Sequence, residues 1–208
     1  MARTLPHHVT LHTVLTHALE QASGALHELI QPAVAFHIVE LQSLTHPTCV
    51  TALSRIIDTQ VTAVQLMWRG TTTGTCILAF PSRNVAQFVA ACTGQAPLGL
   101  QLDAMHTAVF SEIGTLVLAH CVQSMRQCID PALVCALPGM MHGSLAQMLA
   151  PQPDIDAASA VLIHLGCTIA QQYMTGYLIL FCHSGLYEAL ATTTPTHCPE
   201  GGDALCLS

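Results

Sequence analysis

The chain has 208 residues, a length that suits one domain or two fused half-domains. Hydrophobic residues make up 51% of it, and charged residues only 8%, against about 25% in an ordinary soluble domain. The net charge is −7 and the five basic residues are scattered arginines. This balance excludes the basic surface that nucleic-acid binding requires.

The shortage of charge raises the question of a membrane span, which needs about 20 mostly apolar residues. The most apolar region, 157–182, is interrupted by His164, Gln171, Gln172 and Gly176 and predicts two strands and a turn. The N-terminus carries histidines where a signal peptide has its apolar core. We therefore expect a soluble, cytoplasmic protein without membrane insertion.

The ten cysteines and thirteen histidines do not form a recognisable metal or disulfide pattern. No two cysteines have C-x-x-C spacing, and most stand singly in apolar runs, as buried reduced cysteine does. His8 and His12 could share a helix face, but no third ligand lies at a recognisable spacing. The sequence therefore predicts no metal and no cofactor of its own.

The first half of the chain alternates helical and strand patterns. Leu11, Leu15 and Leu19 recur at helical spacing until Pro32, and 60–69 alternates as a strand does. In chain order we predict a helix at 11–30, strands at 33–44, 60–69 and 75–80, with a short helix at 49–57, a turn at 70–74 and a helix from 82 to about 92.

The second half repeats this order. Asp103 is a favourable N-cap for a long helix that ends before Pro131. We predict a helix at 103–129, a strand at 132–137, a short helix at 144–150, strands at 160–170 and 177–182, and a closing helix at 184–191.

The two halves also match in detail, because Gly74–Ser82 aligns without a gap to Gly176–Ser184. This repetition predicts an α/β fold from a duplicated helix–strand–helix–hairpin–helix unit, with a pseudo-two-fold sheet on which the helices pack. We expect a single domain at 10–192, with half-repeats at 10–95 and 100–192, and a flexible tail at 193–208.

P-loop, dinucleotide, nucleophile-elbow and zinc-protease motifs are absent from the sequence. The candidate functional residues therefore lie on the two predicted long helices. Helical spacing puts Ala108, Glu112, Thr115 and Ala119 on one face, where small residues around one carboxylate would suit protein docking. A neighbouring stripe is predicted to face the sheet: Leu102, Met105, Val109, Ile113 and Leu116.

The first long helix carries an equivalent face. Its members are Thr16, Glu20, Ser23 and His27. An isolated glutamate on an amphipathic helix is usually just solvated. The matching places of Glu20 and Glu112 in the two halves favour a shared role instead.

The segment from Phe110 to Pro138 resembles the second active-site segment of the CheC family of chemotaxis phosphatases, which includes CheX and FliY. The family pattern is Asp or Ser, three residues, Glu, two residues, Asn, twenty-two residues, Pro. Glu112, Thr115 and Pro138 have that spacing. The resemblance implies that the glutamate anchors a lysine of a CheY-type receiver domain and that the asparagine orients the water attacking its aspartyl phosphate.

This chain departs from the family pattern at the water-positioning place, where Thr115 and Ser23 replace asparagine. Ala108 and Thr16 replace the Asp or Ser. A hydroxyl can donate and accept as a carboxamide does, but it has a shorter reach. Lost alignment commonly costs on the order of 10²-fold in rate, so the resemblance implies docking with slow hydrolysis or none.

Two functions remain open from the sequence. In the first, the chain docks a phosphorylated CheY-type receiver and hydrolyses its aspartyl phosphate weakly through Glu112, Thr115, Glu20 and Ser23, with Mg²⁺ held by the receiver. In the second, it is a non-catalytic interaction module, as in flagellar switch proteins or as a partner of a CheD-like deamidase. The replaced asparagines favour the second function.

Overall fold

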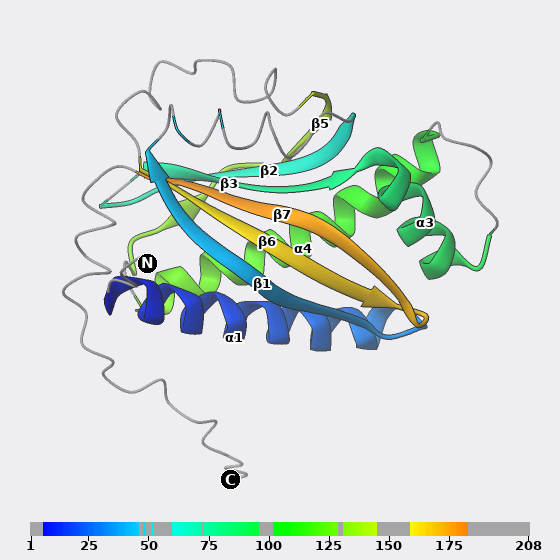
Figure 1. Cartoon of the computed structure of the whole chain (residues 1–208), viewed down its shortest axis with the longest axis horizontal. Coiled ribbons are helices and arrows are strands. Elements are labelled where there is room, and N and C mark those ends of the chain that lie inside the picture. Colours follow the sequence, from blue (N-terminus) through cyan, green and yellow to red (C-terminus); the bar gives the residue numbers. More distant parts are fainter. Residues whose placement is uncertain are drawn as a thin grey trace, which may run out of the picture.

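The computed structural model describes residues 6–45, 48, 51, 60–71, 73–95, 102–128, 131–144 and 159–182. These residues form a sheet with its long helices on one face (Figure 1). The helices are α1 (Pro6–Leu29), α3 (Ser82–Thr93) and α4 (Ala104–Cys128). The strands are β1 (Val34–Thr45), β2 (Val61–Arg69), β3 (Thr73–Pro81), β4 (Val134–Cys135), β5 (Gly139–Gly143), β6 (Ser159–Ile169) and β7 (Gln172–Cys182).

Most predicted elements are confirmed to within a few residues. The predicted short helices at 49–57, 144–150 and 184–191 fall outside the described residues, apart from Thr51 and Ser144. The predicted tail at 193–208 also lies outside them.

The strands of the two halves interleave. Within the described residues the order is β1-β6-β7-β3-β2-β4, and β5 also pairs with β2. The hairpins β2–β3 and β6–β7 therefore meet at the centre of the sheet, and each half's outer strand lies against the hairpin of the other half. This exchange is the pseudo-two-fold arrangement that the repeated sequence predicts.

The pseudo-two-fold axis that relates the two halves passes between two residues that the sequence repeat aligns with each other. Strands β3 and β7 are antiparallel, and Ile77 lies directly opposite Ile179. The gap-free alignment of the halves also equates Ile77 with Ile179. A residue that faces its own repeat equivalent across an antiparallel pair marks a two-fold axis, so the central strands confirm the duplicated fold.

Two glycines at equivalent places in the repeat make room for aromatic rings. A side chain at Gly74 would meet the indole of Trp68, its partner on β2. A Cβ at Gly176 would lie 2.6 Å from the ring of Phe80. These glycines serve ring packing on the helix-covered side of the sheet.

The main core lies between the sheet and the two long helices, which run side by side (Figure 1). On α4 the buried side chains include Phe110, Val117, Leu118 and Cys121. The predicted sheet-facing stripe was wrong in detail. Of its members only Ile113 is buried, while Leu102, Met105, Val109 and Leu116 are half-buried at the flank. The buried arc is wider and rotated because α4 packs against α1 as well as the sheet.

The strand predicted at 132–137 is confirmed only in its middle. Only Val134–Cys135 is a strand there, and β5 at Gly139–Gly143 was missed. Both pieces pair with β2, on either side of Pro138. Proline has no N–H to give to a ladder, so this edge divides into two short strands.

Strand β7 starts earlier than predicted because the turn before it is shorter than the predicted one and ends at Gln171. Ala170 and Gln171 form the β6–β7 turn with positive φ angles of 48° and 66°. Such two-residue hairpins usually carry Asn-Gly or Gly-Gly. Gly176, which suggested the turn, lies within the strand under Phe80 instead.

Helix α4 is long and apolar enough to cross a membrane by its length and composition, over Ala104–Gln127. Its apolar side chains are accounted for by packing, because it contacts α1, β2 and β3 and contributes to the main core. The position of α4 in the core therefore explains why its sequence is so apolar.

Candidate functional site

The N-terminus of α4 is fixed by a cap. The Asp103 carboxylate accepts a hydrogen bond from the backbone N–H of His106 at 2.8 Å, and a second contact joins it to the His106 ring Nδ1 at 2.7 Å. The N–H bond, then the ring contact, lowers the pKa of Asp103 below its ordinary value. This is the predicted N-cap, and it fixes where the helix begins.

The outward face of α4 is the predicted one. Ala108, Glu112 and Ala119 are exposed, and Thr115 is half-buried. On the opposite side Gly114 approaches β2 so closely that an added Cβ would lie 2.5 Å from Cγ2 of Val64. This close approach holds Glu112, two residues earlier, away from the sheet and toward solvent.

The hydroxyl of Thr115 forms no hydrogen bond to any other described residue. It lies one turn from Glu112 on the same face, since residues three apart on a helix are neighbours. A free hydroxyl beside an exposed carboxylate can both donate to and accept from a water or a partner group. The α4 face thus offers one anion and one uncommitted hydroxyl.

The equivalent face of α1 differs at one residue. Glu20 and His27 are exposed as predicted, and the half-buried Thr16 hydroxyl lies 3.4 Å from Nδ1 of His12. Ser23 Oγ, however, donates to the Leu19 carbonyl at 2.7 Å and accepts from the Phe36 N–H at 3.1 Å. Ser23 therefore ties α1 to β1, and its hydrogen is not free to donate to a water.

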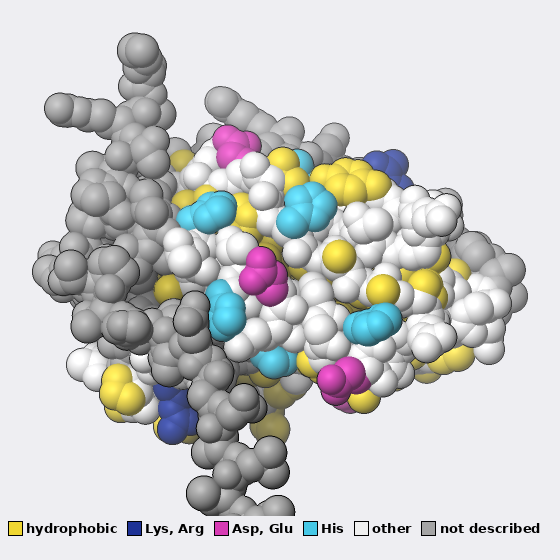
Figure 2. All heavy atoms as spheres, turned by 90° about the horizontal axis from the view of Figure 1, so that it is seen from below, with side chains coloured by type: hydrophobic (Ala, Val, Ile, Leu, Met, Phe, Trp, Pro, Cys, Tyr) yellow, Lys and Arg dark blue, Asp and Glu magenta, His cyan; other side chains and the backbone are white. Residues whose placement is uncertain are grey.

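The helix-covered face of the molecule carries carboxylates that lack a cation. Figure 2 shows acidic side chains standing apart, histidines among them, and Lys or Arg colour only at the rim. Among the described residues the one ion pair is the Asp103–His106 contact. Glu20 and Glu112 thus have no cationic partner among the described residues and remain available to a partner's lysine or arginine.

Burial disfavours the thiolate form of the four described cysteines that lie in the core. Burial raises the pKa of the Cys121, Cys167 and Cys182 thiols to about 12, and it also raises the pKa of Cys76. These thiols stay protonated at neutral pH, as expected for small core residues. No group of three or more His, Cys, Asp or Glu in the described part of the chain could hold a metal ion.

One polar cluster was missed in the sequence. Glu40, His164 and Tyr177 line a pocket on the sheet face opposite the helices. His164 and Tyr177 come from the two strands of one hairpin and Glu40 from β1, far away in the sequence, and the register of the sheet brings them together. Sequence periodicity could not have found them without that register.

No protein-family model and no curated protein sequence matches the chain. Solved structures do match. FliY from Thermotoga maritima has a TM-score of 0.73 at 11% identity, covering 93% of this chain and 100% of its own. The FliM middle domain from H. pylori has a TM-score of 0.61 at 12% identity, covering 93% and 100%.

A chain of the CheX–CheY–BeF3–Mg complex from Borrelia burgdorferi also matches, with a TM-score of 0.50 at 9% identity, covering 80% of this chain and 96% of its own. These identities are too low to carry residue roles across, but the matches extend over nearly the whole length of each protein. The chain has the fold of the CheC/CheX/FliY family, as the resemblance of its Phe110–Pro138 segment and its duplication predicted.

Proposed function

We propose that the chain docks a phosphorylated CheY-type receiver domain through the outward face of α4 and hydrolyses its aspartyl phosphate slowly. The observation that carries this proposal is the exposed Glu112 carboxylate beside the uncommitted Thr115 hydroxyl. Exposed Ala108 and Ala119 flank the pair and let a partner surface approach closely. The fold supports the proposal, since it occurs in proteins of chemotaxis and the flagellar switch.

In this proposal Glu112 anchors a lysine of the receiver. The carboxylate has no cation within the described part of the chain, so a partner's ammonium group would gain a charge-assisted hydrogen bond without displacing another ion. Such bonds contribute about 1.5–3 kcal/mol. Mg²⁺ and the phosphoryl group belong to the receiver, and this chain supplies positioning, on which phosphoryl transfer depends.

Thr115 makes the hydrolysis slow. Its hydroxyl occupies the place of a water-positioning carboxamide but ends closer to the helix, so an attacking water would sit farther from the phosphorus. Misplacement by about 1 Å can cost 10²-fold in rate. Ser23 on α1 has its hydrogen committed to Leu19, so we assign the working half-site to α4 and leave Glu20 as a docking residue only.

The alternative is a non-catalytic interaction module with the same fold, binding a flagellar-switch or CheD-type partner. One observation favours it: the match to the FliM middle domain from H. pylori, with a TM-score of 0.61, is better than the match to the CheX chain, at 0.50. The solved complexes of FliM with FliG and with SpeE show what that relative binds. The two functions differ in whether a phosphorylated receiver decays faster in the presence of this chain.

The test measures both steps with a CheY-type receiver. Binding is followed with the beryllofluoride-activated receiver, and hydrolysis by the decay of the phosphorylated receiver. Glu112→Gln should weaken binding by roughly tenfold or more, while Glu28→Gln, a charge-matched change at another exposed glutamate, should leave it unchanged. Thr115→Asn should speed the decay by on the order of 10²-fold.

The outcomes separate the candidates. Binding that depends on Glu112 without any acceleration of decay, even in Thr115→Asn, identifies the interaction module. Equal binding by Glu112→Gln and the native chain, with an inert Thr115→Asn variant, would show that the α4 face is not the docking site.

A further inference from the structure

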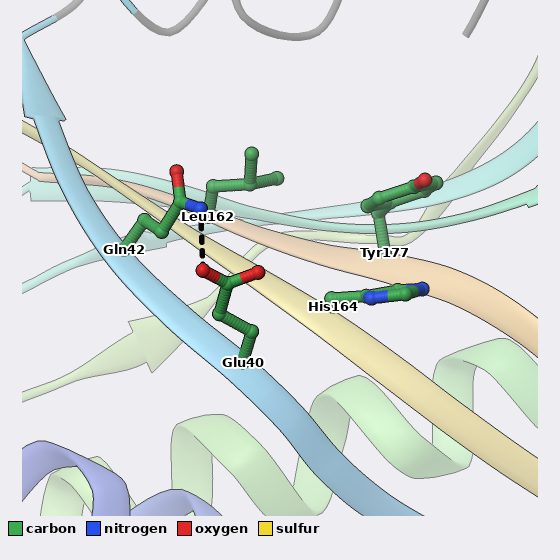
Figure 3. A pocket seen from close by; sticks show the side chains of 5 residues that line it. All are labelled: Glu40, Gln42, Leu162, His164 and Tyr177. Atoms are coloured by element: carbon green, nitrogen blue, oxygen red, sulfur yellow. Dashed lines mark hydrogen bonds between the residues drawn. The ribbon is translucent and has the colours of Figure 1, made fainter. Parts of the chain in front are cut away.

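The sheet face opposite α1 and α4 carries an open pocket of about 120 Å³. The described residues that line it are Glu40, Gln42, Leu162, His164 and Tyr177, contributed by β1, β6 and β7 (Figure 3). The pocket lies on the other side of the sheet from Glu112. It is therefore separate from the proposed receiver-docking face, and a ligand could occupy it whether or not a receiver binds at α4.

A β-bulge places the polar residues of β1 on this face. Val34 and Phe36 point into the helix-covered core, and simple alternation would send residues 40 and 42 the same way. The pairing of β1 with β6 shifts register between Ile38 and Glu40, so one extra residue is inserted there. This turns Glu40 and Gln42 to the opposite face, the kind of side-chain re-aiming for which bulges are retained.

The sheet register sets a carboxylate beside two stacked rings. Glu40 lies directly opposite His164 on β6, and His164 directly opposite Tyr177 on β7. The two rings are nearly parallel, with centroids 5.3 Å apart and an interplanar angle of 15°. Figure 3 shows the stacked pair on one side of the pocket and the Glu40 carboxylate on the other.

The Glu40 carboxylate can accept further hydrogen bonds. Gln42 Nε2 donates to Oε1 of Glu40 at 2.8 Å, and in Figure 3 the second oxygen is turned away from the amide, toward the side on which His164 lies. No arginine in the described part of the chain pairs with Glu40. Burial raises the pKa of Tyr177, so its phenol stays protonated and the ring carries no charge of its own.

The size of the pocket limits its occupant. Sites for drug-sized ligands and cofactors occupy roughly 300–1,000 Å³. A volume of about 120 Å³ suits a single side-chain head group, and the exposed Glu40 side chain at its edge can be reached by a group presented from another protein surface. The chain itself has only five basic residues and a net charge of −7, so a cation is more readily supplied by a partner.

We propose that this pocket binds the guanidinium group of an arginine side chain from a partner protein. A guanidinium is flat, so it can stack against the half-buried ring pair that lines the pocket while it donates forked hydrogen bonds to the Glu40 carboxylate. The Gln42 amide holds the carboxylate in place by its bond to Oε1. An ammonium group lacks the flat face and the fork, so lysine fits less well.

The test is a titration of the full chain with N-acetyl-arginine amide, followed by NMR signals of the His164 and Tyr177 rings. We expect saturable shifts of both rings, with a dissociation constant in the millimolar range. Glu40→Gln should weaken binding about tenfold or more because it removes the charge. Tyr177→Phe keeps the ring and should retain binding, whereas Tyr177→Leu should weaken it several-fold. Glu28→Gln is the matched control and should bind as the native chain does.

Two ligand controls keep the proposal open to refutation even if a variant folds poorly. N-acetyl-citrulline amide has the same shape without the charge and should not bind. N-acetyl-lysine amide should bind several-fold more weakly than the arginine compound. Equal shifts with citrulline, equal affinity for lysine, or unchanged affinity in a folded Glu40→Gln variant would each overturn the assignment.

Discussion

At the scale of single residues, Asp103 decides how α4 begins. Its carboxylate accepts a hydrogen bond from the backbone N–H of His106 and also contacts the His106 ring. The His106 side chain is buried. The first turn of the helix would otherwise have backbone donors without partners. Since α4 carries Glu112 on one side and core residues on the other, fixing where the helix begins also helps to position the proposed docking face.

The Asp103 cap predicts a dependence of stability on acid. Because the folded chain lowers the pKa of Asp103, the folded state favours the ionised carboxylate, and its contribution is complete above the ordinary aspartate value of 3.8. It is lost as the pH falls below 3.8 through the folded-state pKa. Asp103→Asn keeps an acceptor but cannot titrate, so its melting temperature should fall less steeply than that of the native chain in this range.

The measurement for the cap is the melting temperature by circular dichroism between pH 7 and pH 2.5. Asp103→Ala, which removes the acceptor, should melt at a lower temperature than the native chain at pH 7. Glu28→Gln serves as the control for simple loss of charge. Parallel pH curves for Asp103→Asn and the native chain would show that the cap does not titrate as argued.

At the same scale, Ser23 shows that a hydroxyl at a predicted site position can take part in hydrogen bonds that join two elements of the fold. It stands at the place equivalent to Thr115, yet it joins the Leu19 carbonyl to the Phe36 N–H. Serine in a helix often bonds the carbonyl four residues earlier. Here the second bond reaches a different element, so Ser23 also fastens β1 to α1.

At the scale of elements, Gly114 sets the distance between α4 and the sheet. An added Cβ would lie 2.5 Å from Cγ2 and 3.0 Å from Cβ of Val64, which is too close for packed carbon atoms. The neighbour is a β-branched side chain on a central strand and has little freedom to turn away. The glycine is therefore required by the approach of the helix to β2.

Gly114→Ala should destabilise the fold by about 1–3 kcal/mol through overpacking, although alanine is the better helix former. Gly24→Ala in α1 is the matched control, because an added Cβ there meets nothing within 4 Å. That change should stabilise the chain by up to about 1 kcal/mol. Urea unfolding of the two variants measures both effects.

A double variant checks the cause. Val64→Ala removes Cγ2, the nearest of the clashing atoms, and leaves only Cβ at 3.0 Å, so Gly114→Ala should cost less in that background than alone. If Gly114→Ala is as harmless as Gly24→Ala in the native background, the helix is not held at the distance described.

At the scale of the whole molecule, the two halves complete one sheet together. Within the described residues β1 pairs only with β6, and β4 and β5 pair only with β2. The central contact is the β3–β7 pair around Ile77 and Ile179. Each half thus lacks strand partners that the other supplies, although each repeats the same order of elements.

This interleaving predicts that neither half folds alone. A fragment of residues 1–95 should show no cooperative thermal transition by circular dichroism, because β1 would lose its partner β6 and β3 would lose its partner β7, which leaves open sheet edges. Mixing it with a fragment of residues 96–208 should restore the transition and a single complex in size-exclusion chromatography. Cooperative unfolding of the first fragment by itself would contradict this prediction.

The sequence by itself determined the local features of this protein. Helical spacing predicted α1 and α4 and the outward side of Glu112, because a solvated helix must keep one side polar. The gap-free repeat predicted the duplication and equated Ile77 with Ile179, the pair that proved to lie on the symmetry axis. The resemblance to the CheC family gave the fold without any overall sequence match.

Only the tertiary structure decided the features that depend on register and on contacts between elements. The buried arc of α4 shifted because the helix packs on two neighbours, and the hydroxyl of Ser23 proved to be bound to β1. The cluster of Glu40, His164 and Tyr177 exists only because a bulge and two strand registers bring them together. Periodicity reports the side to which a residue points within its own element, and it contains no information on which residue of another element lies opposite.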